Sequence, residues 1–74
     1  MSVYNFAIKE QKEKENLLAS LYNIILSELH RIESKEFDYE AIREKRKDVA
    51  NIKTMLDQTR ALIESLSKVA LKAA

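Results

Sequence analysis

The apolar positions of the chain follow a helical repeat over two long stretches. In the first stretch the repeating residues are Leu18, Tyr22, Ile25, Leu29 and Ile32. In the second they are Ile42, Val49, Ile52, Leu56, Ile63, Leu66 and Ala70. Steps of three and four residues are the spacing of the face with which one α-helix packs against another. The pattern therefore predicts one helix over about residues 5–33 and a second over about residues 39–72.

Residues 34–38 are the predicted turn between these helices, because small and acidic residues replace the apolar repeat there. Asp38 can cap the second helix, since its carboxylate can accept the free N–H groups of the first turn. Phe37 and Ile42 have the spacing of a hydrophobic staple across that cap. A connection this short makes the helices antiparallel neighbours. The whole chain of 74 residues is thus expected to be one all-α domain, an antiparallel two-helix hairpin.

The first predicted helix carries more apolar surface than one partner helix covers. Its large apolar residues between positions 17 and 32 are Leu17, Leu18, Leu21, Tyr22, Ile24, Ile25, Leu26, Leu29 and Ile32. At about 100° per residue they span an arc of roughly 200°. A helix that packs on a single neighbour needs a stripe only slightly over about 100° wide. A second surface is therefore expected to cover the remainder of the arc.

The apolar parts of the two predicted helices are also offset along the hairpin. Facing residues should have numbers that sum to about 71, so residues 17–32 lie opposite 39–54, which contain the charged run 43–48. Conversely, the apolar residues of 52–71 face the mostly polar residues 1–19. This offset predicts uncovered apolar surface at opposite ends of the two faces. Covering one Leu or Ile side chain contributes about 1.5 to 3 kcal/mol, so a few of them would decide whether the hairpin is stable alone.

The small size of the chain strengthens the case for association. A core built from 74 residues is marginal, and without cysteine no disulfide can support it. The hairpin is therefore expected to be completed to a bundle by a second copy or by another protein. The residues predicted to contact the partner are Leu18, Leu21, Tyr22, Ile25, Leu29, Met55, Leu56, Leu62, Ile63, Leu66 and Val69.

Composition adds few candidates for chemistry. The lone histidine, His30, has no serine, cysteine or second histidine placed to complete a nucleophilic set. Glu40 and Glu44 share a helix face, but no Glu-x-x-His motif accompanies them. We expect no enzyme activity, no metal site and no cofactor. The first nine residues lack the pattern of a secretion signal and no long apolar run predicts a membrane span, so a cytoplasmic location is expected.

A basic run in the second helix raises nucleic-acid binding as a third hypothesis. Its cations are Arg43, Lys45, Arg46, Lys47 and Lys53. Acidic residues alternate with them, and 13 Lys and Arg against 12 Asp and Glu leave the chain close to neutral, which disfavours phosphate binding. Elsewhere, spacings of three or four residues predict surface ion pairs within one helix, such as Asp57 with Arg60 and Glu64 with Lys68.

The chain resembles one known family, the small two-helix co-chaperones of bacterial type III secretion needle subunits. The likeness lies in the size, the short turn, the tyrosine of Asp38-Tyr39-Glu40, and the apolar stretch 49–63. The resemblance implies a cytoplasmic protein that binds a larger, tetratricopeptide-like chaperone through its apolar faces and helps to keep a needle subunit soluble. The alternative is a homodimeric four-helix bundle that serves as a small regulator or adaptor of phage, plasmid or bacterial type.

Overall fold

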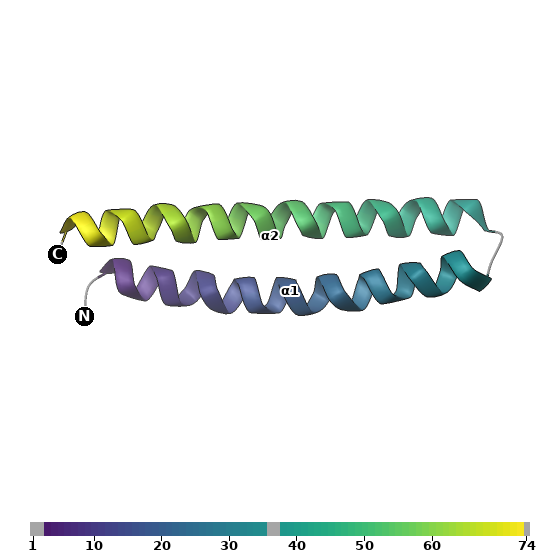
Figure 1. The fold of residues 1–74 in the computed structure, drawn as a ribbon, viewed down its shortest axis with the longest axis horizontal. Coiled ribbons are helices and arrows are strands. Elements are labelled where there is room, and N and C mark those ends of the chain that lie inside the picture. The colour runs from purple at the N-terminus through teal and green to yellow at the C-terminus, as the bar shows by residue number, and fades with distance from the viewer. Residues whose placement is uncertain (1–2, 36–37, 74) are drawn as a thin grey trace.

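The chain forms two long helices, as the apolar repeat predicts. The structure is a computed structural model and describes residues 3–35 and 38–73. Helix α1 runs over Val3–Lys35 and helix α2 over Tyr39–Ala73, so each extends slightly beyond its predicted bounds. Glycine and proline are absent from the sequence, which leaves no strong helix breaker within either element. Figure 1 shows the helices antiparallel, with the start of α1 and the end of α2 at the same end of the hairpin.

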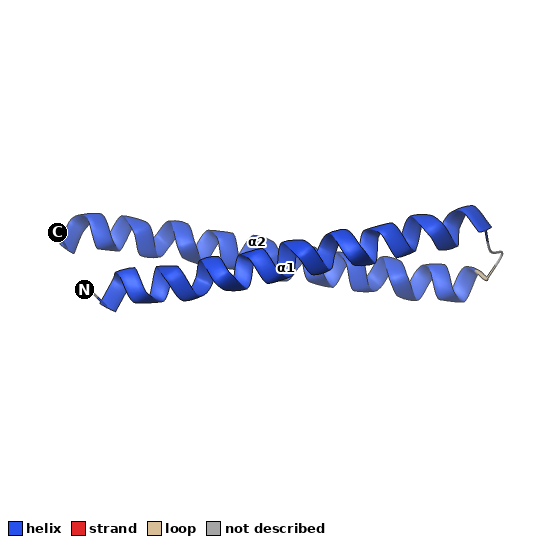
Figure 2. Ribbon diagram, turned by 90° about the horizontal axis from the view of Figure 1, so that it is seen from below, coloured by secondary structure: helices blue, strands red, loops and turns tan. Residues whose placement is uncertain are grey.

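The hairpin is a thin rod in which each helix has one neighbour. Its dimensions between Cα atoms are 56 × 14 × 12 Å. The two helices pack against each other along the rod and cross at a shallow angle near its middle (Figure 2). Because no third element lies on either helix, residues that point away from the shared seam have no cover from the described residues.

The predicted cap at Asp38 is confirmed. Its Oδ1 accepts hydrogen bonds from the backbone N–H groups of Glu40 and Ala41, both at 3.1 Å. The N–H of Ile42 donates to the Asp38 carbonyl, also at 3.1 Å, which closes the first turn of α2. Phe37, the expected staple partner of Ile42, lies outside the described residues.

Removing this cap is expected to destabilise the hairpin. Asp38→Ala should lower the free energy of unfolding by about 1 kcal/mol, because two N–H groups of the first turn of α2 lose their acceptor. Asp57→Ala is the matched control, since Asp57 is an exposed aspartate within α2. Urea unfolding followed by circular dichroism measures both. Equal losses in the two variants would show that the Asp38 bonds do not stabilise the helix start.

The register of the hairpin differs from the predicted one. Helix α1 continues two residues beyond its predicted end, through Lys35, and the Ser34 hydroxyl donates to the Arg31 carbonyl at 2.9 Å in its last turns. Because the helices end at 35 and restart at 39, level residues have numbers that sum to about 74, not 71. Each residue of α1 therefore faces a position in α2 about one turn later than expected.

The core of the hairpin is small. The buried apolar residues of the described chain are Leu29, Ile52 and Leu56, and the one buried polar residue among them is Thr59. All four lie on the predicted seam, or continue its spacing of three and four residues. The Thr59 hydroxyl donates to the Met55 carbonyl at 2.9 Å, so it is satisfied within its own helix. With so few buried side chains, most large apolar residues keep substantial exposure.

Candidate interaction surface

One row of exposed apolar side chains runs along α1. Leu17, Leu21 and Ile24 are spaced by four and three residues and are 73%, 42% and 57% exposed. This spacing places them on one side of the helix. Helix α2 therefore leaves part of the apolar arc of α1 uncovered, which confirms the surplus predicted from the sequence.

A second exposed row runs along α2. Met55, Leu62 and Val69 are separated by seven residues each, and all three are 42% to 51% exposed. Seven residues make two helical turns, so the three side chains project in nearly the same direction. The row lies beside the buried Leu56 and Thr59, at the edge of the seam.

The two rows lie on the same side of the hairpin. Lys14 of α1 lines a groove between the helices together with Met55 and Leu62 of α2. Leu17 and Leu21 follow Lys14 by three and seven residues, so they share its side of α1. Six residues therefore form one surface, here called the apolar face. They are Leu17, Leu21, Ile24, Met55, Leu62 and Val69.

The apolar face corrects one prediction. The offset of the helices was expected to leave apolar surface at opposite ends of the hairpin. In the observed register Met55 is level with about residue 19, between Leu17 and Leu21, so the two rows meet at mid-length. The uncovered surface is thus continuous and lies in the part of the rod away from the turn.

The other side of the hairpin carries ion pairs between the helices, together with the exposed Tyr39 and Leu71. Arg60 donates to Glu15 at 3.0 Å, and Arg46 donates to Glu33 at 2.6 Å. The two arginines are fourteen residues apart, so they project in the same direction. Arg60 lies two residues before Leu62, or about 200° around the helix, which places this direction away from the apolar face. The two ion pairs therefore lie on the side of the rod away from the apolar face.

These contacts differ from the predicted pairs. Arg60 was expected to pair with Asp57 on its own helix, but it contacts Glu15 of the other helix. The predicted pair of Glu64 with Lys68 is present at 3.3 Å. Bonds between the helices depend on register, which a spacing rule within one helix does not contain.

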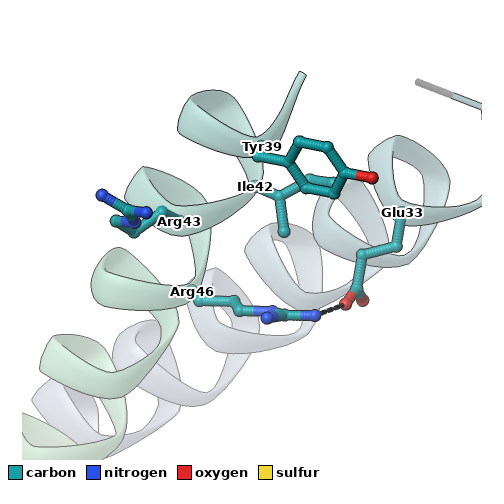
Figure 3. Close-up of a pocket in the computed structure, with 5 residues that line it drawn as sticks. All are labelled: Glu33, Tyr39, Ile42, Arg43 and Arg46. Atoms are coloured by element: carbon teal, nitrogen blue, oxygen red, sulfur yellow. Dashed lines mark hydrogen bonds and ion pairs between the residues drawn. The ribbon is translucent and has the colours of Figure 1, made fainter. Parts of the chain in front are cut away.

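The basic run of α2 is divided by the fold. Lys45 donates to Glu28 at 2.8 Å and Arg46 donates to Glu33, so two of its five cations contact carboxylates of α1. Figure 3 shows an open hollow near the turn in which Arg46 reaches toward Glu33 while Arg43 points away from both. Nucleic-acid binding by a continuous basic surface therefore has less geometric support than its sequence suggests.

The ion pair between Lys45 and Glu28 lowers the pKa of the Glu28 carboxyl. The main cause is the hydrogen bond from the Lys45 ammonium, followed by its electrostatic attraction and a smaller one from Arg31. Partial burial opposes these effects but does not cancel them. The folded hairpin thus favours the ionised form of Glu28 more than the unfolded chain does.

Acid is expected to remove the contribution of Glu28 to stability. A lowered folded-state pKa means that this contribution is present at neutral pH and is lost as the pH falls below the usual glutamate value of about 4.3. Glu28→Gln should therefore make the fall in unfolding free energy between neutral pH and acid shallower. Glu64→Gln is the control, because the side chains of Glu64 and Lys68 are both about 70% exposed. The same slope in wild type and Glu28→Gln would contradict this assignment.

The predicted partner residues divide into three groups. Leu21, Met55, Leu62 and Val69 are exposed. Leu18, Tyr22, Ile25, Ile63 and Leu66 are partly covered by the other helix. Leu29 and Leu56 are buried between the helices, so a partner reaches them only if the hairpin opens. Leu17 and Ile24, which are also exposed on the apolar face, are not among the predicted partner residues.

The described residues offer no candidate metal centre. They contain no group of three or more His, Cys, Asp or Glu side chains placed to hold an ion. His30, Glu40 and Glu44 are exposed. Neither helix, over its described length, is long and apolar enough to cross a membrane. No protein-family model, curated protein or solved structure matches the chain.

Proposed function

We propose that the chain is a protein–protein interaction module whose apolar face binds a helical surface. The observation that carries the proposal is the exposure of six large apolar side chains, 42% to 73% each, on one side of the rod. Contiguous apolar surface bordered by polar residues marks an association site. Full burial of such a side chain contributes about 1.5 to 3 kcal/mol. Covering the exposed part of six of them contributes a share of this from each against the entropy lost on association.

A helix is the element that fits this face. A hollow between α1 and α2 is lined by Met55 and Leu62 together with the polar Gln11, Lys14, Gln58 and Thr59. The exposed apolar residues of the face continue on either side of it at spacings of three, four and seven. An amphipathic helix presents anchors at the same spacings and packs its ridges between such rows. The other side of the hairpin is crossed by the ion pairs Glu15–Arg60 and Glu33–Arg46, and we assign it to solvent.

The test compares charges placed on the two sides of one helix. Leu62→Glu puts a carboxylate in the apolar face. Leu71 follows Leu62 by nine residues, which is about two and a half helical turns, so Leu71→Glu puts a carboxylate on the opposite side of α2. Leu71 is 79% exposed, so neither change removes buried packing. We expect both variants to keep the helical circular dichroism spectrum of the wild type at high concentration. We expect Leu62→Glu and Leu17→Glu, but not Leu71→Glu, to dissociate the complexes that the wild type forms.

The readout is the mass of the species by sedimentation, for the purified chain and for its co-purified complexes. Complexes that persist in both Leu17→Glu and Leu62→Glu would overturn the proposal. So would a wild-type chain that stays monomeric alone and in extracts of its native host.

The resemblance to the type III co-chaperones names one candidate occupant, a larger tetratricopeptide-like chaperone built from helices. Such a partner is consistent with the helical surface that the apolar face requires. This candidate remains a prediction, as does the cytoplasmic location. The proposal assigns no catalytic role to any residue.

A further inference from the structure

We infer that the helical surface that covers the apolar face is a second copy of this chain. In this arrangement the two hairpins stack face to face with their turns at the same end, and α1 of each lies on α2 of the other. The inference rests on the proposed function and adds to it the occupant and its alignment.

The dimensions of the face suit a second hairpin. Two rods in full overlap each cover a strip 56 Å long and 14 Å wide, roughly 780 Å², which is close to the approximately 800 Å² per partner of a stable interface. Along the rod axis the apolar face spans about twenty helical residues, or about 30 Å. A staggered pair that overlaps only there would cover about half as much, below the range of stable interfaces. Full overlap therefore brings the pair closest to the size of a stable interface.

The position of the apolar face sets the direction of the second copy. The face occupies the part of the rod away from the turn, from Ile24 to the level of Val69. Toward the turn, the same side of the rod carries Glu28, Glu44 and Asp48. Glu28 follows Leu21 by seven residues, and Asp48 and Glu44 precede Met55 by seven and eleven, so they continue the two apolar rows. Full overlap with the turns at opposite ends would place apolar residues against these carboxylates and desolvate them. Turns at the same end bring the apolar faces of the two copies to the same heights along the rod, with Met55 of one copy level with Leu17 and Leu21 of the other.

The charges near the turn favour α1 on α2. Arg31 and Lys35 follow Ile24 by seven and eleven residues, so they share the side of the apolar face on α1. Asp48 and Glu44 precede Met55 by seven and eleven residues on α2. A two-fold axis along the rod brings the cations of one copy over the carboxylates of the other. Because a two-fold axis along the rod always places α1 of one copy on α2 of the other, this charge match supports turns at the same end.

Glu28 is the one carboxylate of α1 on this side near the turn. It already contacts Lys45 of its own chain at 2.8 Å, so it does not cancel the match between the copies. The net charge of this part of the face is positive on α1 and negative on α2. Complementary charges of this kind fix register and orientation more than they add affinity.

The experiment combines mass with one distance. The chain has no cysteine, so Ser34→Cys gives a single site for a spin label near the turn. We expect a dimer by sedimentation equilibrium and a distance between labels within roughly 30 Å, the width of a four-helix bundle with two label arms. Full overlap with the turns at opposite ends would give about 45 Å or more, since each label then lies about fifteen residues from the centre.

A charge exchange provides the second arm. Glu44→Lys with Asp48→Lys should weaken the dimer at least about tenfold, and adding Arg31→Glu with Lys35→Glu should restore it. A dimer whose labels are about 45 Å or more apart, or a dimer that the second charge exchange does not restore, overturns the proposed alignment of the two copies and leaves the proposed function in place. A folded monomer at about 1 mM overturns the second copy alone. The proposed function fails separately, if Leu17→Glu and Leu62→Glu leave every complex intact.

Discussion

Leu56→Ala is expected to destabilise the hairpin by about 2 to 5 kcal/mol. Leu56 is 5% exposed and lies at the centre of the seam, where its side chain is enclosed by α1. Truncation removes apolar contact and leaves a cavity that two straight helices cannot easily close. A domain of 74 residues has a total stability of only about 4 to 11 kcal/mol. The midpoint of urea unfolding, followed by helicity, should therefore fall by a large part of its wild-type value.

Met55→Ala is the matched control, because Met55 is the neighbouring residue and is 51% exposed. Its effect on a dilute monomer should stay below about 1 kcal/mol, since little buried contact is lost. At concentrations where the apolar face is covered, the same variant should lose more stability, because the free energy of a dimer depends on concentration. If Leu56→Ala were no more damaging than Met55→Ala at high dilution, the core would not lie where the structure places it.

The seam of the hairpin could be predicted from spacing alone. Leu29, Ile52 and Leu56 are buried because each occupies the face that a period of 3.5 residues selects, and this period does not depend on any detail of the turn. The cap at Asp38 is equally local, since the carboxylate bonds N–H groups two and three residues away. Features that depend only on residues close in sequence could therefore be predicted from the sequence.

The register between α1 and α2 could not be predicted from the spacing, because it depends on where α1 ends. Helix α1 runs to Lys35, which moves all facing pairs by about one turn. That shift decides that Arg60 contacts Glu15 and that Met55 lies level with the exposed leucines of α1. A spacing rule within one helix does not contain the position at which that helix ends, so it cannot supply this shift.

The apolar face itself has a signal in the sequence that the seam obscures. Met55, Leu62 and Val69 form a heptad row beside the seam, and Leu17 and Ile24 form another. Which sides of two antiparallel helices coincide follows from the right-handed sense of both helices once the seam is fixed. The two rows, taken together with the side of the seam on which each lies, are therefore sufficient to predict that they share one side of the hairpin, whereas their relative height depends on the register.

Gln11→Leu is expected to stabilise the hairpin by about 1 to 3 kcal/mol. Gln11 lies on the seam of α1, and its Oε1 atom is buried without a hydrogen-bond partner in the described part of the chain. An acceptor that has left water without gaining a donor costs free energy, and leucine removes that cost while extending the apolar seam toward Leu18. The midpoint of urea unfolding should therefore rise in this variant.

Thr59→Val serves as the comparison, because Thr59 is also a polar residue of the seam but its hydroxyl already bonds the Met55 carbonyl. Its substitution should change stability by less than about 1 kcal/mol. A loss of stability in Gln11→Leu would show that the amide oxygen has a donor after all. If Gln11→Leu gains stability as expected, then Gln11 lowers the free energy of unfolding of the wild type. The best-attested role of a polar residue on a helix seam is to fix the register of the helices. Spin labels on Lys9→Cys and Lys68→Cys within one hairpin should then show a broader distance distribution in Gln11→Leu than in the wild-type background.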